Sequence, residues 1–499
     1  MRPATPSAGV APGVAPGVAF EAVIGIEIHV QLRTASKMFC GCSNDIGAAA
    51  PNANTCPVCL GLPGALPVIN REAVRHVLAT GIAIEATTPE VTRWDRKNYF
   101  YPDLPKGYQI SQYELPLASN GRLVVETSRG SVEVGITRAH LEEDTARLQH
   151  TRQAGRPVSL LDYDRSGAPL MEIVSEPVIH DAETARRYAE ELRLLLLTIG
   201  ASHAAMESGQ MRVEANVSLR PAGSDAFGTR VEVKNMNSFR SVERAIEFEI
   251  ARQESALRAG EPLIQETRGW DDDRGVTYHM RAKETSDDYR YFPEPDLPPL
   301  RVDPAWLAEI RAALPELPAA RRARYRDELG LSAYDADVLV TDAAATALFE
   351  AARAADAALS PQRLANWVSG EYLRLAKGDD PTVDATRISG TQLAALVRLV
   401  EDGHVSGTNA KEVLLRVART GRPVAEVVAE AGFRQISDAA ALQVAVDEVI
   451  AENPAAVADI RAGAQKAIGF LTGRVMQKTR GQADAGLVQQ LIRSTLEVD

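Results

Sequence analysis

The stretch VIGIEIHVQL, residues 23–32, alternates apolar and polar or small side chains along its whole length. Successive side chains of a β-strand point to opposite faces, so this period of two predicts a strand. Glu27 and His29 then share one face, and the isoleucines lie on the other. Taken alone, such a strand is equally typical of a half-exposed sheet whose polar face meets water.

Three further stretches extend this pattern. MRVEANVSLRP (211–221) and TRVEVKN (229–235) alternate in the same way, and VEVGITRAHLEED (132–144) does so less regularly. Their polar faces carry Arg212, Glu214, Glu232, Lys234, His140 and Glu142. Because several strands place charged groups on one face, we expect a sheet that uses that face for binding or chemistry.

Helices are predicted between these strands, over residues 181–200 and 241–260. Asp181 and Ser241 are suitable N-caps, and Gly200 and Gly260 suit the C-terminal ends. Strands in runs, with helices covering one side, are typical of the α+β class with an antiparallel sheet. We call this predicted domain the cradle, because its uncovered face would be concave and polar.

Changes in composition and periodicity divide the 499-residue chain into further parts. Strand signals and turns fill residues 21–303, which we assign to the cradle domain, and helical spacing of Ala, Leu, Arg and Glu follows. Interruptions at Gly421 and Pro423 suggest an all-α helical domain over 304–425 and a small helical tail domain over 426–499. Residues 1–20, rich in Pro, Gly and Ala, read as a disordered extension.

Composition and charge restrict the class of protein. With 45% hydrophobic and 24% charged residues, the chain is ordinary globular material. The net charge of −12 leaves nucleic-acid binding open, because phosphate contact depends on local clusters of basic residues. No apolar run reaches the roughly 18 residues that a membrane span needs, and Pro and Gly break up the N-terminal stretch where a signal peptide would lie. We therefore expect a soluble, cytoplasmic protein.

All four cysteines, Cys40, Cys42, Cys56 and Cys59, lie in one short segment. Cys-x-Cys followed by Cys-x-x-Cys suits two knuckles that share one tetrahedral zinc ion, and the surrounding Gly and Pro residues favour the necessary turns. The alternative is four reduced, buried thiols. Four protein ligands leave no open coordination position, so a zinc knuckle over 40–59 would be structural.

The polar sheet face offers a second kind of site. Carboxylates with one imidazole suit Mg²⁺, which completes its shell with water and phosphate oxygens. Arg212, Arg220 and Lys234 could then meet phosphates. The alternative for each group is a solvated surface position, and the chain has neither a Walker-type loop nor a G-x-G-x-x-G turn.

Long sequence blocks after residue 20 resemble the GatB family, one of the subunit types of the tRNA-dependent amidotransferases. The blocks include GIEIHVQLRTASKMFCGC (25–42), CPVCLGLPGALPVIN (56–70), RKNYFYPDLPKGYQISQ (96–112), HLEEDTARL (140–148), LDYDRSGAPLMEIVSEP (161–177), MRVEANVSLRP (211–221), VEVKNMNSFRS (231–241), YRYFPEPDLPPL (289–300) and GFLTGRVMQKTRGQADAGLVQQLI (469–492). Some members of this family lack the four-cysteine cluster.

The resemblance implies an ATP-dependent carbon–nitrogen ligase. ATP would phosphorylate the side-chain carboxylate of Glu-tRNA(Gln), Asp-tRNA(Asn) or both, and ammonia would replace the phosphate. The ammonia would come from glutamine through a partner amidase subunit, and a small third subunit would complete a heterotrimer. A nucleophile for glutamine hydrolysis is missing from this sequence as we interpret it, since the cysteines are assigned to zinc.

The resemblance also implies roles for particular residues. His29, Glu142 and Glu172 match the family's magnesium positions, and Glu27 is expected to contact the metal through water or to orient the nucleotide. Glu27 and these three residues are therefore the predicted catalytic set. Predicted ATP- and substrate-binding residues are Lys106, Tyr108, Arg212, Glu214, Glu232 and Lys234.

Each of these assignments has a plainer alternative. Glu214, Glu232 and Lys234 could form structural ion pairs on the sheet face. Lys106 and Tyr108 could belong to a packed Pro-rich loop, although a cation and an aromatic ring also suit a single-stranded tRNA 3′ end. We interpret His140 as structural.

The tail presents Arg474, Lys478 and Arg480 close together, which we predict to contact the tRNA backbone. A solvated helix face is the alternative there. For the whole chain, the competing hypothesis is a non-catalytic, zinc-containing scaffold that binds tRNA while a partner performs the chemistry.

Overall fold

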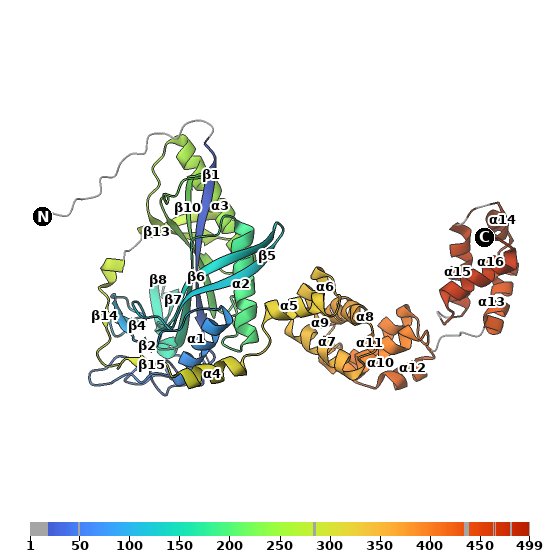
Figure 1. The fold of residues 1–499 in the computed structure, drawn as a ribbon, viewed down its shortest axis with the longest axis horizontal. Coiled ribbons are helices and arrows are strands. Elements are labelled where there is room, and N and C mark those ends of the chain that lie inside the picture. The colour runs from blue at the N-terminus through green and yellow to red at the C-terminus, as the bar shows by residue number, and fades with distance from the viewer. Residues whose placement is uncertain are drawn as a thin grey trace. The chain divides into compact units, whose positions relative to one another are not determined.

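The computed structural model describes residues 18–47, 50–282, 286–433, 439–462, 464, 466–479 and 482–498. Of the predicted disordered extension at 1–20, residues 1–17 lie outside the described residues. The chain forms two compact units, Met1–Leu317 and Pro318–Asp499 (Figure 1). The first unit is rich in strands and the second is helical, which confirms the predicted α+β class with helical C-terminal parts.

An eight-stranded sheet dominates the first unit, in the order β13-β12-β11-β10-β1-β9-β6-β5. The strands are β1 (Phe20–Gln31), β5 (Ala118–Thr127), β6 (Gly130–Glu143), β9 (Pro169–Ser175), β10 (Met211–Pro221), β11 (Val231–Met236), β12 (Glu266–Asp271) and β13 (Val276–Ala282). Neighbouring strands are antiparallel except β11 and β12, which are parallel. The expected antiparallel sheet is thus a mixed one, because helix α3 (Phe239–Ala259) forms the crossover that a parallel pair requires.

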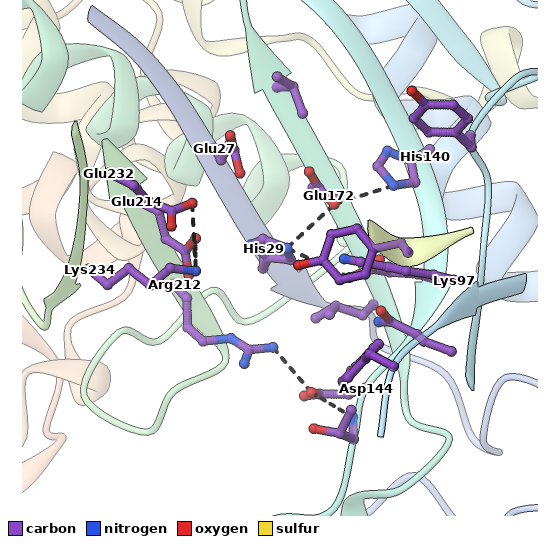
Figure 2. A pocket seen from close by; sticks show the side chains of 18 of the residues that line it. Glu27, His29, Lys97, His140, Asp144, Glu172, Arg212, Glu214, Glu232 and Lys234 are labelled. Carbon is purple, nitrogen blue, oxygen red and sulfur yellow. Dashed lines mark hydrogen bonds and ion pairs between the residues drawn. The ribbon is translucent and has the colours of Figure 1, made fainter. Parts of the chain in front are cut away.

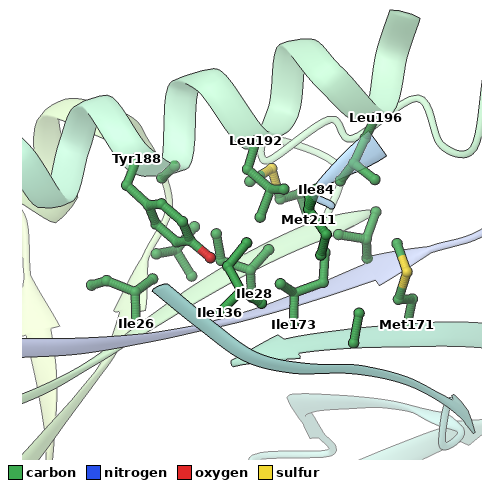
Figure 3. Close-up of a cluster of buried hydrophobic side chains, with 14 of the residues drawn as sticks. Ile26, Ile28, Ile84, Ile136, Met171, Ile173, Tyr188, Leu192, Leu196 and Met211 are labelled. Atoms are coloured by element: carbon green, nitrogen blue, oxygen red, sulfur yellow. The ribbon is translucent and has the colours of Figure 1, made fainter. Parts of the chain in front are cut away.

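Helices α1 (Arg71–Ala83), α2 (Ala182–Thr198) and α3 cover the apolar face of this sheet. Ile26 and Ile28 of β1 are fully buried there. Figure 3 shows Tyr188 and Leu192 of α2 lying over these isoleucines. The alternation in the first strand therefore separates a buried apolar face from a polar face, as predicted.

The helix ends follow the sequence signals with one exception. Asp181 caps α2 by accepting a hydrogen bond from the Thr184 backbone N–H, and Gly200 after the helix has a left-handed conformation. Gly260 ends α3 in the same conformation. The predicted cap Ser241 is wrong, however, because Ser238 caps α3 and Ser241 lies in its first turn.

Small sheets and short helices stand beside the large sheet. They comprise β2 (Val91–Thr92) with β15 (Leu300–Arg301), β3 (Asp95–Asn98) with β4 (Tyr108–Ser111) and β14 (Phe292–Pro293), the hairpin β7 (Arg147–Gln153) and β8 (Arg156–Asp162), η1 (Tyr163–Arg165) and η2 (Ser286–Tyr289). The β3–β4–β14 sheet supplies a wall of the cavity described below.

Helix α4 (Pro304–Ala313) contacts α1, and its Ile310 is buried in the cradle core. The first unit accordingly continues to Leu317, beyond the boundary at 303 that the change from strand signals to helical spacing suggested. Helical spacing after a Pro-rich segment does not distinguish a new domain from one more helix on the old core.

The second unit consists of two groups of helices. The first group is α5 (Pro318–Asp327), α6 (Ala333–Thr341), α7 (Ala343–Ala355), α8 (Pro361–Asn366), η3 (Trp367–Tyr372), α9 (Leu373–Ala376), η4 (Ala385–Arg387), α10 (Gly390–Glu401), α11 (Gly407–Thr420) and α12 (Val424–Ala431). The second is α13 (Ala439–Glu452), α14 (Pro454–Arg461), α15 (Lys466–Lys478) and α16 (Ala485–Leu496), which pack around a hydrophobic core of their own. The predicted boundary at 425 falls inside α12, and α12 contacts α11 of the first group. The first group therefore continues beyond the predicted boundary. Across the described residues, no helix has both the length and the low charge required to cross a bilayer.

Candidate active site

A cavity of about 440 Å³ opens on the polar face of the large sheet. Its lining includes residues from β1, β6, β9, β10 and β11, together with residues of the β3–β4–β14 region (Figure 2). The predicted residues that line it are Glu27, His29, Glu142, Glu172, Arg212, Glu214, Glu232 and Lys234. The structure thus brings together side chains that are scattered over much of the cradle sequence.

Strand register places these groups in rows across the sheet. His29 of β1 lies opposite Glu172 of β9 on one side and opposite Arg212 of β10 on the other. Glu172 in turn lies opposite His140 of β6. Directly opposed side chains on one face approach closely, so the row brings basic and acidic groups into contact.

His29, Glu142 and Glu172 form the first cluster, with one potential ligand atom from each lying within 4.8 Å of the others. The His29 Nε2 atom is 3.5 Å from Glu172 Oε2 and 3.7 Å from Glu142 Oε1. Burial by itself would lower the pKa of His29, but Glu172, Glu142 and Glu214 raise it to about 9. The protonated imidazole of His29 therefore offsets one of the two carboxylate charges.

The donor set of this cluster fits a divalent cation. One imidazole and two buried carboxylates converge, which is a hard, oxygen-rich set. Among the described residues, no group forms a hydrogen bond with the buried Nδ1 atom of His29, so only the Nε2 side of the ring is held by polar contacts. The three residues are therefore suited to hold Mg²⁺.

Glu27, Glu214 and Glu232 form a second cluster, again with ligand atoms within 4.8 Å of one another. Lys234 Nζ donates to Glu214 Oε2 at 2.7 Å and lies 3.8 Å from Glu232 Oε1. Burial lowers the pKa of Lys234, while Glu214 and Glu232 raise it. The ion pairs expected under the plainer alternative are thus present, but they lie inside the cavity, where phosphate groups could compete for the lysine.

Asp144 lines the cavity but was not among the predicted site residues. Its carboxylate accepts from Gln31 Nε2 at 3.0 Å and from Arg212 Nη2 at 3.2 Å, and Arg165 Nε lies 3.6 Å away. Burial opposes its ionisation, but the two arginines lower the pKa of Asp144. Asp144 comes two residues after Glu142, so the alternation that selected Glu142 could also have identified it.

His140 lies in the cavity, with its Nε2 atom 3.4 Å from Glu172 Oε2. We interpreted this residue as structural, and the contact shows that it also orients a carboxylate of the first cluster. Burial raises the pKa of Glu172, but His140 and His29 together hold it well below its usual value. Glu172 is therefore ionised and available to a cation.

Lys97 and several aromatic residues were missed by the sequence reasoning. Lys97 lines the cavity, and its Nζ atom lies 4.8 Å from the centre of the Tyr289 ring. Burial lowers the pKa of Lys97, but Glu142 and Glu172 raise it above its usual value. Lys97 belongs to β3 in a separate small sheet, and no local pattern shows that this sheet faces the large one.

Lys106 and Tyr108 do not line this cavity. Lys106 forms an ion pair with Glu143, and the Arg96 guanidinium lies 4.1 Å from the centre of the Tyr108 ring. Of the same sequence block, Lys97, Tyr99 and Gln109 reach the cavity instead. The block contributes to the site, but through other residues than those selected from the sequence.

Cys40, Cys42, Cys56 and Cys59 are gathered so that their sulfur atoms lie within 4.8 Å of one another. The Nζ atom of the buried Lys37 lies 3.7 Å from Cys59 Sγ. Hydrogen bonding from Cys40 and the nearby lysine charge lower the pKa of Cys59 to about 5. Four converging thiols, one of which ionises readily, fit a tetrahedral zinc ion.

The predicted tail residues have different surroundings. Lys478 lies 2.7 Å from Glu448 and 2.9 Å from Glu452, and Arg474 donates to Gln477. Arg480 lies outside the described residues. Lys478 is thus partly neutralised by the neighbouring helix α13.

Two family models match separate parts of this chain. A family model described as the GatB/GatE catalytic domain matches residues 22–308, which is more than half of the chain. The chain belongs to the GatB family. The resemblance inferred from the sequence blocks is thereby confirmed, and a second model, described as the GatB domain, matches residues 347–496.

Relatives of this GatB-family chain are similar over nearly their full length. The GatB subunit of the aspartyl/glutamyl-tRNA(Asn/Gln) amidotransferase from Carboxydothermus hydrogenoformans is 48% identical, covering 96% of this chain and 99% of the relative. Its counterpart of the same name from Thermomicrobium roseum is 49% identical with the same coverage. A third, from Moorella thermoacetica, is 48% identical over 96% of this chain and all of the relative.

Proposed function

We propose that this chain is the subunit that activates and amidates the side-chain carboxylate of misacylated tRNA. The substrates are Glu-tRNA(Gln), Asp-tRNA(Asn) or both, in keeping with the names of the relatives. The observation that supports it most strongly is the convergence of two acidic clusters and several cations in one cavity. A scaffold would have no need to desolvate so many charges together.

The reaction has two steps. An oxygen of the substrate carboxylate attacks the γ-phosphorus of ATP, and ADP leaves with the bridging oxygen. Ammonia then attacks the acyl carbon, inorganic phosphate leaves with the former carboxylate oxygen, and a proton is lost. Positioning and charge neutralisation account for most of the catalysis in such phosphoryl transfers.

Residues of the chain can be assigned to these demands. His29, Glu142 and Glu172 would hold Mg²⁺. Glu27, two residues before His29 on the same face of β1, would contact the metal through water or orient the nucleotide. A bound Mg²⁺ would neutralise charge on phosphate oxygens. Lys234 and Arg212 face the same cavity and can exchange their carboxylate partners for phosphate.

Ammonia would come from partner subunits, namely an amidase and a small third subunit. The described lining of the cavity includes no serine or cysteine, and the four cysteines lie together in their own cluster. Hydrolysis of glutamine needs an activated nucleophile, and the cysteines, the strongest candidates in this chain, lie apart from the cavity. The chain would therefore work in a heterotrimer.

The phosphorylation step can be tested by trapping. With the complex reconstituted from all three subunits, ATP, Mg²⁺ and Glu-tRNA(Gln) or Asp-tRNA(Asn), but with hydroxylamine in place of glutamine, we expect a side-chain hydroxamate. One ADP should form for each hydroxamate, because hydroxylamine displaces phosphate from the acyl phosphate. A control without ATP gives the background. Amide formation by the complex without trapped hydroxamate or stoichiometric ADP would contradict the proposal.

The tail domain provides a separate prediction. Ending the chain after residue 433 keeps α12 with its partner α11 and removes the helices α13–α16, which have their own core. We expect tRNA binding to weaken by about tenfold or more, because backbone contacts are lost, while ATP binding is unchanged. Filter binding of tRNA and equilibrium binding of ATP to the complex measure this. Equal weakening of both would indicate general damage instead.

A further inference from the structure

Tyrosines form one wall of the cavity, beside the first acidic cluster. This tyrosine wall consists of Tyr99, Tyr113, Tyr289 and Tyr291, all of which line the cavity. The rings of Tyr113 and Tyr291 stack, with centroids 4.3 Å apart and planes inclined by 11°. Tyr289 forms T-shaped pairs with both Tyr99 and Tyr291, with ring centroids 6.1 and 6.2 Å apart. All four rings therefore contribute aromatic surface to the lining of the cavity.

Two tyrosines of the wall are partly exposed to solvent, unlike the side chains of a hydrophobic core. Tyr113 remains 38% exposed and Tyr291 is half-buried. The charge of Glu142 acts on both Tyr99 and Tyr291, and burial together with that charge raises the pKa of each. The tyrosines thus lie next to the cluster where the carboxylate would be phosphorylated.

A cation accompanies the wall. Arg138 of β6 lies two residues before His140 and lines the same cavity, with its guanidinium 5.7 Å from the centre of the Tyr113 ring. Among the described residues, no partner accepts a hydrogen bond from its buried Nε atom. This differs from Arg212 and Lys234, which are each paired with a carboxylate. No carboxylate among the described residues pairs with Arg138, so the charge of its guanidinium remains for a ligand in the cavity.

Stacking surfaces beside an available guanidinium match the requirements of a single-stranded RNA end. Bases released from a duplex stack on aromatic side chains, and arginine takes the adjoining phosphate. We propose that the tyrosine wall and Arg138 bind the 3′-terminal adenosine of the charged tRNA, with its base stacked on the outer face of the Tyr113–Tyr291 pair. This inference rests on the proposed function and identifies which residues receive the substrate's nucleoside.

Two adenine-bearing ligands enter the reaction, and the charge distribution favours the RNA end at this wall. Arg212, Arg230 and Lys234 line the cavity on the β10–β11 side, which suits the triphosphate of ATP. The aminoacyl ester is joined directly to the terminal ribose. Its side-chain carboxylate can thus reach His29, Glu142 and Glu172 only if that nucleoside is held close by.

Binding experiments on the reconstituted three-subunit complex test this inference. The probe is an acceptor-stem minihelix ending in CCA, with glutamate joined to its 3′ end through a stable amide, compared with the same RNA lacking the terminal adenosine. We expect the complete probe to bind about tenfold more tightly, since one stacked base contributes that much. Tyr113→Ala and Tyr291→Ala should each remove most of this preference, and Tyr→Phe at either position should restore it because the ring remains.

The contribution of Arg138 has its own signature. Arg138→Gln should weaken binding of the complete probe and reduce the slope of log affinity against log salt concentration by about 0.7, the value for one phosphate contact with a single strand. Tyr334→Ala, at a tyrosine that is 75% exposed on α6, is the matched control and should change neither quantity.

The dissociation constant for ATP separates the two sources of adenine. We expect it to stay within about twofold of the unsubstituted value in the tyrosine variants, which also shows that they fold. Weaker ATP binding with an unchanged preference for the complete probe would assign the wall to ATP and overturn the inference. An unchanged preference with unchanged ATP binding would overturn it as well. Failure of hydroxamate trapping in the unsubstituted complex would refute the proposed chemistry alone, because the minihelix measurement does not depend on turnover.

Discussion

Glu142→Gln should lower tRNA-dependent ATP hydrolysis and amide formation together, by about 10²- to 10³-fold in kcat. The substitution preserves the shape of the side chain but removes one of the two buried carboxylates beside His29. His29→Ala should have a similar effect, because it removes the imidazole that lies between Glu142 and Glu172. Steady-state rates of ADP release and of Gln-tRNA or Asn-tRNA formation by the reconstituted complex measure both reactions.

Glu133→Gln is the matched control for this experiment. Glu133 lies on the same strand, β6, but its side chain is 58% exposed and does not line the cavity. Its replacement should leave both rates within about twofold, as is usual for solvated positions. If turnover survived both Glu142→Gln and His29→Ala, the chain would be a scaffold rather than the site of chemistry. A requirement for higher Mg²⁺ concentration in the variants would support the assignment of these residues to the cation.

Loss of zinc from the four-cysteine cluster should lower the stability of the cradle rather than the rate of the chemical step. We expect about one zinc ion per chain by elemental analysis, and none in a Cys56→Ser, Cys59→Ser double variant. The melting temperature of the cradle should fall by about 5–10 °C, which corresponds to a loss of a few kcal/mol in a unit of this size. Differential scanning calorimetry of the complex, with and without a chelator, measures this.

The contacts around the cysteines explain why the effect should spread. Ser166 Oγ donates to the Cys59 carbonyl at 3.1 Å, and the Asn54 N–H donates to Asp164 at 2.7 Å. The turn that contains Ser166 continues to Gly167, whose N–H donates to the Asp144 carbonyl. A zinc ion would therefore hold the turn that supports Asp144, and hence Arg212, at the edge of the cavity.

Ser43→Ala is the control, since Ser43 is exposed in the same segment and is not a candidate ligand. It should retain zinc and the melting temperature of the unsubstituted chain. Absence of zinc from pure, fully active complex would refute the zinc assignment and leave four reduced thiols. The cluster at His29, Glu142 and Glu172 would be unaffected by that result, because none of its residues belongs to the knuckle.

Much of the site could be predicted because strand alternation is a local property. The period of two in VIGIEIHVQL puts Glu27 and His29 on one face whatever the strand pairs with. Glu172 was located only by resemblance, since its stretch PLMEIVS is nearly all apolar and mostly buried. The parallel pairing of β11 and β12 was missed, because the crossover by α3 is not visible in the strand patterns.

By itself, then, the sequence determined the α+β class, the polar face with its carboxylates and histidine, the gathering of the cysteines and the family. Only the tertiary structure decided that His140 contacts Glu172, that Asp144 pairs with Arg212, and that the tyrosine wall faces the acidic cluster. It also decided that Lys97 and Tyr99 line the cavity, whereas Lys106 pairs with Glu143. The physical reason is that the alternation within one strand determines to which face of the sheet a side chain points. Which residues it then contacts depends on strand register and on packing between sheets that are distant in the sequence.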